Sequence, residues 1–280
     1  MAQSLYTRAL DHFISFLAVK DRTVYVAQFL ENENVKLKTI VVTSQRHSVK
    51  QLLTQWLEMY FKNQIAIVDI INKEALKKMD LTSIDLVITL DSFLILKDVE
   101  VFNMDKLPEI KDIERLNSMI HMIRMNKRVS KILDCYIQKE HVKVYPDTKE
   151  LPELLQEMSK KLHESGFISD TKGFYEDVLL REKNYPTNLG SQMMGPHALF
   201  TFADKTGIEV ALLKKPFEHH GNQVQLVFLL ALEKKRNDEI NLLFQFFNQI
   251  VSHKKYMHAL LQSEDSDAFI KNLYSFKLLE

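Results

Sequence analysis

Glycine placement is the feature of this sequence that most restricts where its backbone can turn sharply. The chain has 6 glycines, all between residues 166 and 221, and the first 165 residues have none. Glycine reaches backbone conformations that other residues adopt only with strain. Two of them, Gly190 and Gly195, flank a short loop that ends at Pro196 and His197. We therefore expect the tightest turns of this chain, and any chemistry that it performs, to lie around His197.

Composition predicts two domains and no dominant charged surface. The 280 residues are 46% hydrophobic, which is enough for sizeable cores and favours two domains over one. Lys+Arg and Asp+Glu both total 37, so the net charge is zero. A dominant surface for nucleic acid or for an anionic membrane needs a basic excess, so neither surface is expected.

Cysteine usage and hydropathy predict a cytoplasmic protein without a membrane segment. Cys135 is the single cysteine, so no internal disulfide can form and a reducing compartment fits. The longest apolar run, residues 226–232, has the length of a buried strand. A membrane helix needs ~18 apolar residues. No signal peptide opens the chain, and we expect no contact with a membrane.

The first half of the chain predicts a small α/β domain with a parallel sheet. Residues 1–35 read as helical, with apolar side chains at helical spacing. Beyond them, short β-branched runs alternate with helical patterns, and such alternation is typical of a parallel sheet covered on both faces. The runs that we expect to form strands are residues 37–42, 65–70, 85–90 and 98–102. A long helix over 111–140 follows, and we place the domain boundary at 140–147.

The second half predicts an α/β sandwich. Residues 151–164 form an amphipathic pattern with Pro152 in the first turn, and 173–182 predict a second helix. The segments that we expect to form strands are 198–203, 208–213 and 224–231, and the closing helices are 238–254 and 266–276. The fold class is therefore α/β throughout.

His197 is the candidate phosphoacceptor. A histidine that carries a phosphoryl group needs a neutral ring nitrogen, a fixed and exposed position, and donors for the phosphate charge. Pro196 restricts the backbone before His197, Gly195 lets that backbone approach a partner, and Arg181 could clamp the phosphate. The alternative is a loop histidine that caps a turn, and spacing and composition alone leave both interpretations open.

Motifs of the second half resemble a known family. The helix that ends in Arg181 and Glu182, the turn at Thr187, and Gly195-Pro196-His197 are similar to the mannitol/fructose-type enzyme IIA domain of the bacterial sugar phosphotransferase system. The resemblance covers residues 148–280 and implies that His197 accepts phosphate beside Arg181. Many members carry a second histidine where this chain has Glu239, and a carboxylate there would repel a phosphohistidine.

The first half is similar to the galactitol-type enzyme IIB domain over residues 36–140. In that family a phosphorylated cysteine lies in the loop after the first strand, where backbone amides cradle the phosphate. Here Thr43 lies near the cysteine position, Ser48 lies later in the loop, and Cys135 is far along the chain. The resemblance implies a conserved fold without the cysteine chemistry.

The two modules together resemble the C-terminal half of sugar-responsive transcriptional regulators of the BglG and mannitol-activator kind. Residues 1–35 would then be the end of a phosphorylation-controlled regulatory domain. The implied partners are phosphorylated HPr or a IIB protein, and nucleic acid would be bound only by a domain absent from this chain. A homodimer is one option for the oligomeric state. Whether the chain is part of a longer protein stays open, as does the controlling sugar.

Two other functions remain open from the sequence. The chain could be a transport component that passes phosphate onward to a IIB partner, or an interaction module whose two sites are inactive. We expect no cofactor and no metal site, because the histidines lack a carboxylate or cysteine set at ligand spacing. The sequence also lacks the nucleophile-elbow motif that a Ser–His–Asp hydrolase would carry. We expect His219 and His220 to be surface residues.

Overall fold

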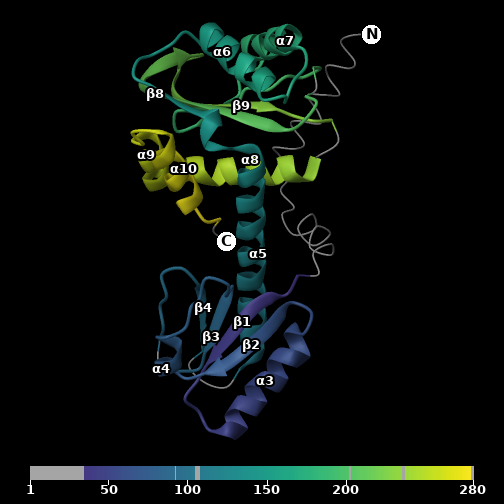
Figure 1. The fold of residues 1–280 in the computed structure, drawn as a ribbon, viewed down its shortest axis with the longest axis vertical. Coiled ribbons are helices and arrows are strands. Elements are labelled where there is room, and N and C mark those ends of the chain that lie inside the picture. Colours follow the sequence, from purple (N-terminus) through teal and green to yellow (C-terminus); the bar gives the residue numbers. More distant parts are fainter. Residues whose placement is uncertain (1–34, 92, 105–107, 202, 235–236, 279–280) are drawn as a thin grey trace. The chain divides into compact units, whose positions relative to one another are not determined.

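The computed structural model divides into two compact units, residues 1–120 and 121–280. It describes residues 35–91, 93–104, 108–201, 203–234 and 237–278 (Figure 1). The helical interpretation of residues 1–35 falls almost entirely outside the described residues. The division between the units falls within a long helix, α5 (Ile110–Tyr136). Each unit is described by itself.

The first unit is built on a parallel sheet with the order β2-β1-β3-β4. Its strands are β1 (Leu37–Val42), β2 (Ile65–Ile71), β3 (Leu86–Thr89) and β4 (Glu100–Asn103). Its helices are α3 (His47–Phe61), α4 (Lys73–Leu76) and the first part of α5. The parallel α/β class expected for this half is confirmed.

Both faces of this sheet are buried, which explains the continuous apolar runs of its strands. Ile40, Val42 and Val87 pack with Leu76 of α4 on one face. The other face meets α5, where the Arg115 guanidinium lies 5.0 Å from the centre of the Phe102 ring of β4. The strand patterns were readable because β-branched residues fill both faces.

The second unit contains a mixed sheet with the order β5-β8-β9-β7-β6. Its strands are β5 (Val142–Tyr145), β6 (Asn188–Gly190), β7 (Met193–Met194), β8 (Gly207–His219) and β9 (Asn222–Ala231). Its helices are the 3-10 turn η2 (Lys139–His141), α6 (Leu151–Glu164), α7 (Thr171–Asn184), α8 (Asn237–Ser252), α9 (Lys254–Leu261) and α10 (Ser266–Ser275).

The second unit has three layers (Figure 1). Helices α6 and α7 cover one face of the sheet, where Leu154 and Phe174 pack with Val227 of β9. Phe228 points to the opposite face and contacts Phe247 of α8 and Phe269 of α10, with ring centres 4.6 and 6.2 Å apart. The central strand is therefore buried on both sides, and the predicted α/β sandwich is confirmed.

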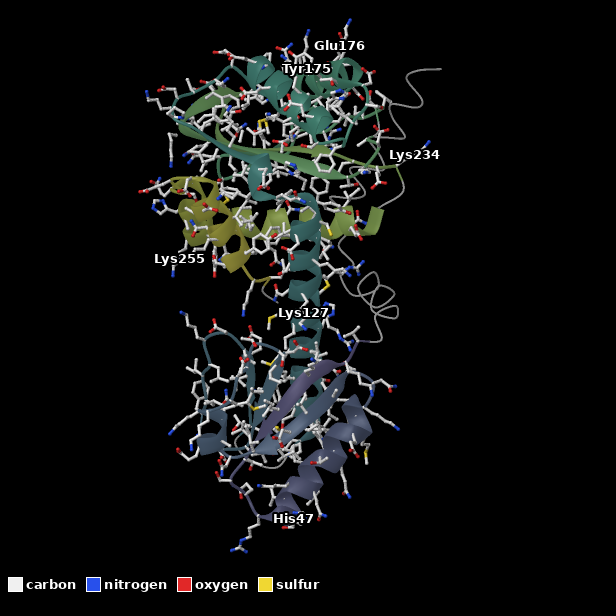
Figure 2. The ribbon with its side chains drawn as sticks, viewed as in Figure 1. His47, Lys127, Tyr175, Glu176, Lys234 and Lys255 are labelled. Carbon is white, nitrogen blue, oxygen red and sulfur yellow. The ribbon has the colours of Figure 1, made fainter. Side chains whose placement is uncertain are left out.

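Charged side chains surround this core (Figure 2). Glu176 lies on the outer side of α7 and Lys255 on the outer side of α9, and both are exposed (Figure 2). None of the helices formed by the described residues is both long enough and apolar enough to cross a membrane.

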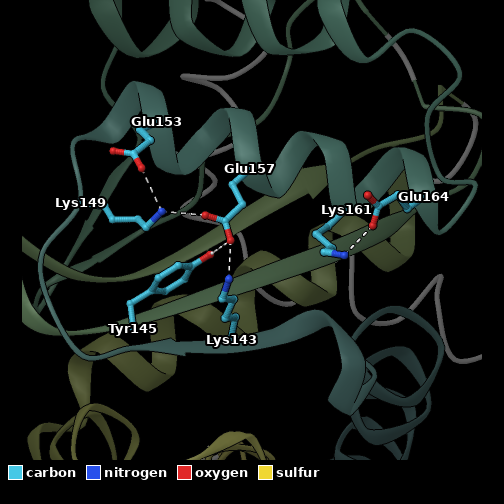
Figure 3. A network of polar contacts seen from close by, with 7 residues as sticks. All are labelled: Lys143, Tyr145, Lys149, Glu153, Glu157, Lys161 and Glu164. Carbon is cyan, nitrogen blue, oxygen red and sulfur yellow. Dashed lines mark hydrogen bonds and ion pairs between the residues drawn. The ribbon is translucent and has the colours of Figure 1, made fainter.

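A polar network joins α6 to β5 (Figure 3). The Glu157 carboxylate accepts hydrogen bonds from Lys143, Tyr145 and Lys149, at 3.0 Å from the Tyr145 hydroxyl and 2.8 Å from Lys149 Nζ (Figure 3). Partial burial acts to raise the pKa of Glu157, but these three hydrogen bonds outweigh it and lower the pKa to about 2. The Glu157 carboxylate therefore stays ionised at neutral pH.

One expected strand is wrong. Among the described residues of 198–203 there is no strand, and His197 makes only an isolated bridge to Leu230. The physical reason lies in α7, because the Asp177 carboxylate accepts hydrogen bonds from the Phe200 and Thr201 backbone N–H groups, both at 2.7 Å. Those donors would otherwise pair with a neighbouring strand.

Candidate functional site

The loop that carries His197 is tied to the sheet at several points. A tight turn joins β6 to β7 through positive φ at Gly190, Ser191 and Gln192, with values of 99°, 47° and 67°. The Gly195 N–H then donates to the Thr187 carbonyl at 3.1 Å, and the Leu230 N–H donates to the Pro196 carbonyl at 2.9 Å. The glycine-rich stretch therefore places His197 in a fixed position beside the central strand β9.

A hydrogen bond determines the tautomer of His197. Its Nδ1 lies 2.9 Å from the Gly195 carbonyl oxygen. A carbonyl oxygen only accepts, so Nδ1–H donates, and the lone pair of the neutral ring resides on Nε2. The nitrogen available as a nucleophile in this tautomer is therefore Nε2.

His197 is more buried than expected. Only 8% of its surface is exposed, whereas the sequence suggested an exposed position. The ring lies against Phe244 of α8, with ring centres 5.8 Å apart, and its backbone pairs with Leu230 of β9. The position is fixed, as expected, but a helix that is distant in sequence covers part of the ring.

Burial and a neighbouring guanidinium keep His197 neutral. Desolvation and the charge of Arg181 lower the pKa of His197 to about 3, against the opposing effects of the Gly195 carbonyl and Asp177. Arg181 belongs to α7 and is itself buried, at 4% exposure. The structure therefore brings the two principal candidates of the sequence analysis, His197 and Arg181, close enough to interact.

Asp177 also acts on His197, and the sequence analysis did not predict it. It lies one helical turn before Arg181, so the two residues share a face of α7. Its carboxylate raises the pKa of His197 and also holds the backbone of Phe200 and Thr201, as described above. The spacing of four residues from Arg181 was the available signal.

Glu182 and Thr187 form a second buried group. The Glu182 carboxylate accepts hydrogen bonds from the Thr187 N–H, at 3.1 Å, and from the Thr187 hydroxyl. It also lies 3.3 Å from His219 Nε2. His219 is only 14% exposed, so its assignment as a surface residue is wrong, because the β8–β9 hairpin brings it onto the end of α7. His220 is exposed, as expected.

Glu239, which stands where the family often has a second histidine, lies in the first turns of α8. Its carboxylate accepts a hydrogen bond from the Tyr136 hydroxyl. The charges that shift the pKa of His197 are those of Arg181 and Asp177. The expected effect of Glu239 on a phosphohistidine stays a prediction.

The first unit holds the remaining candidates, Thr43 and Ser48. Thr43 is buried and its hydroxyl accepts the Gln45 N–H at 3.1 Å, while Ser48 is exposed in the first turn of α3. Between them, the Ser44 N–H and hydroxyl donate to the Asp91 carboxylate, at 3.0 and 2.9 Å. The Asp91 carboxylate thus occupies donors of the loop that follows β1.

The described residues offer no cluster of three or more histidine, cysteine, aspartate or glutamate side chains that could hold a metal ion.

A family model describes the same region. Residues 135–275 match the family "Phosphoenolpyruvate-dependent sugar phosphotransferase system, EIIA 2", which is half of the chain, and the chain therefore belongs to this family. The resemblance noted for residues 148–280 is thereby confirmed.

Two relatives extend across most of the chain. It is 24% identical over 251 residues to the "Probable licABCH operon regulator" of Bacillus subtilis, covering 88% of this chain and 38% of that protein. It is 25% identical over 250 residues to the "Transcriptional regulator ManR" of the same organism, covering 84% of this chain and 37% of that protein. The chain thus spans well under half of either relative.

Solved structures also match about half of the chain. The crystal structure of IIA mannitol from Escherichia coli is 18% identical, with a TM-score of 0.43 over 49% of this chain and 98% of that one.

Proposed function

We propose that this chain is the part of a transcriptional regulator that senses the state of the sugar phosphotransferase system, with His197 as phosphoacceptor. One observation carries the proposal: a neutral His197 has its lone pair on Nε2 because Nδ1–H donates to Gly195. The proposed donor is phosphorylated HPr or a phosphorylated IIB protein, in keeping with the family. The two regulators that align with most of the chain favour regulation over transport.

The transfer that we propose moves one phosphoryl group from a nitrogen or sulfur of the donor to a nitrogen of His197. The N–P or S–P bond of the donor breaks as His197 Nε2 forms a bond to phosphorus, and the donor's nitrogen or sulfur keeps the electron pair of the broken bond. Arg181 stabilises the charge on the phosphoryl oxygens. The Nδ1–H bond to Gly195 remains through the transfer, so the ring does not need to turn.

Phosphorylation would act on the regulator through charge. A phosphoryl group adds about −2 near neutral pH. Placed beside Arg181, this charge would change the contacts of α7 and α8 and, through them, the activity of the whole regulator. We propose that this occurs in the cytoplasm, where a phosphorylated HPr would be available, and that DNA or RNA is bound by another part of such a regulator.

The first unit is proposed to take no part in phosphoryl transfer. Its loop has Thr43 near the expected cysteine, and Asp91 accepts hydrogen bonds from Ser44 in that loop. A second anion there would meet the charge of Asp91.

The test is phosphorylation in vitro with phosphoenolpyruvate, enzyme I and HPr. The native protein should gain one acid-labile phosphoryl group by intact mass, and His197→Ala should gain none. Arg181→Ala should slow labelling roughly 100-fold, because a preorganised donor to the phosphoryl oxygens is lost. His220→Ala, at an exposed histidine outside this site, is the control and should label like the native protein. Normal labelling of His197→Ala would overturn the assignment.

The burial of His197 favours a second candidate, an interaction module that accepts no phosphate. It predicts no label on the native protein while an active IIA domain labels normally in the same reaction. Transfer of label from this protein to a purified IIB domain would instead support the transport alternative.

A further inference from the structure

A continuous series of hydrogen bonds links the β8–β9 hairpin to His197. It begins at His219, whose Nε2 lies 3.3 Å from the Glu182 carboxylate. The same carboxylate accepts the Thr187 N–H at 3.1 Å. The Thr187 carbonyl accepts the Gly195 N–H at 3.1 Å, and the Gly195 carbonyl accepts His197 Nδ1–H at 2.9 Å. Each of these hydrogen bonds therefore fixes the position of the next residue in the series.

Burial gives this series its rigidity. Glu182 is 1% exposed, and Thr187 and His197 are buried as well. A buried carboxylate is costly unless its oxygens accept hydrogen bonds. Thr187 supplies two donors and His219 a third, and the third is present only while the hairpin lies on the end of α7.

We propose that Glu182 and His219 are a positioning pair for His197, which sets the Thr187–Gly195 contact and through it the orientation and tautomer of the phosphoacceptor ring. The inference rests on the proposed function of His197. Neither residue touches the phosphoryl group; both act through the backbone of the loop. The β8–β9 hairpin thereby becomes part of the phosphoacceptor site.

The pair also makes the site sensitive to pH. Glu182 of α7 and His220 of the same hairpin are the ionisable groups that act on His219. Burial lowers the pKa of His219 below its ordinary value, against the attraction of Glu182, so the ring is neutral at neutral pH. Protonation below that pKa would put a full positive charge beside Glu182 and draw the carboxylate from Thr187. We expect labelling to slow as the pH falls through this pKa.

The experiment measures the labelling rate against phospho-HPr concentration for the full chain and its variants. His219→Ala should lower the rate at saturating phospho-HPr roughly tenfold, the effect of losing one hydrogen bond to a buried charge. The phospho-HPr concentration at half the maximal rate should not change, because His219 does not contact the donor. His220→Ala is the matched control and should change neither quantity.

Conservative replacement separates positioning from folding. Thr187→Ser keeps the hydroxyl and should keep the rate, whereas Thr187→Val should slow labelling as His219→Ala does. The decline at low pH should be lost in His219→Ala and kept in His220→Ala. Equal rates and pH profiles for His219→Ala and His220→Ala would overturn the inference while leaving the proposed function intact.

A measurement that does not depend on phosphorylation tests the positioning pair even if the native protein takes no label. ¹⁵N NMR of histidine-labelled protein reports which ring nitrogen of His197 carries the proton. The native protein should show Nδ1–H, and Glu182→Gln and Thr187→Val should show a mixture of tautomers. A native protein that takes no label would refute the proposed function alone, and an unchanged tautomer in both variants would refute the positioning pair.

Discussion

Burial keeps two ionisable side chains of the second unit neutral, in opposite ways. His197 loses its proton because desolvation and Arg181 disfavour the imidazolium. Glu209 of β8 keeps its proton because desolvation raises the pKa of its carboxyl to about 8, with Lys161 opposing the shift and Glu164 adding to it. The same cause therefore yields a neutral base at one end of β9 and a neutral acid on β8.

Glu209 should make the stability of the second unit fall as the pH rises. Its carboxyl ionises near 4.5 when unfolded and near 8 when folded, so the folded state holds the extra proton between these values. The free energy of unfolding should therefore decrease across this interval, by up to ~1.4 kcal/mol per pH unit. In Glu209→Gln this decrease should be absent. Urea denaturation at several pH values measures it.

The control for Glu209 lies on the same strand. Glu218 is exposed, so Glu218→Gln should keep the pH dependence of the native protein. If Glu209→Gln showed the same decrease as Glu218→Gln, the carboxyl would have to be hydrated and ionised in the folded protein.

At the scale of elements, a side-chain contact ties the loop between β1 and α3 to the end of β3. Ser44 follows β1 and Asp91 follows β3, and both lie at the carboxyl edge of the parallel sheet. At this edge, the Ser44 N–H and hydroxyl donate hydrogen bonds to the Asp91 carboxylate. We attribute a structural role to this contact.

Removing the Asp91 carboxylate should destabilise the first unit mildly. Asp91→Ala should lower its free energy of unfolding by about 1 kcal/mol, because two exposed hydrogen bonds to a charged group are replaced by bonds to water. Asp91→Asn keeps an acceptor oxygen and should lose less. The readout is the fluorescence of Trp56, the single tryptophan of the chain, which lies on α3. Equal stability of Asp91→Ala and the native protein would contradict the structural role.

At the scale of the whole molecule, the chain combines two units with separate cores. Contacts divide at residues 120 and 121, within α5, and each unit has its own sheet. Units with separate cores can unfold in separate transitions. Trp56 reports only on the first unit, so a change confined to the second unit can be recognised.

Phe228→Ala tests this separation. The ring fills the space between β9, α8 and α10, so its loss should lower the free energy of unfolding of the second unit by about 3–5 kcal/mol. Circular dichroism should show an earlier transition, whereas the Trp56 fluorescence transition should not move. Leu180→Ala, at an exposed position of α7, should change either transition by less than about 0.5 kcal/mol. A parallel shift of the Trp56 transition would show that the units unfold together.

The sequence by itself determined the class of each unit and the neighbourhood of its chemistry. β-branched runs with both faces apolar specified the strands β1, β3 and β9, because burial on two sides requires it. Gly190, which has a positive φ, marked the turn before His197, because glycine adopts that conformation without strain. These signals lie within short segments, so the amino-acid sequence alone is enough to recognise them.

Only the tertiary structure decided what surrounds His197. The described residues of 198–203 form no strand, because Asp177, more than twenty residues earlier, accepts hydrogen bonds from the Phe200 and Thr201 N–H groups. His219 is withdrawn from the surface by Glu182 on a different element. The pKa of His197 is low because the ring is shielded from water, with Phe244 packed against it, and because the positive charge of Arg181 acts on it. These effects depend on distances between elements, and no spacing along the chain encodes such distances.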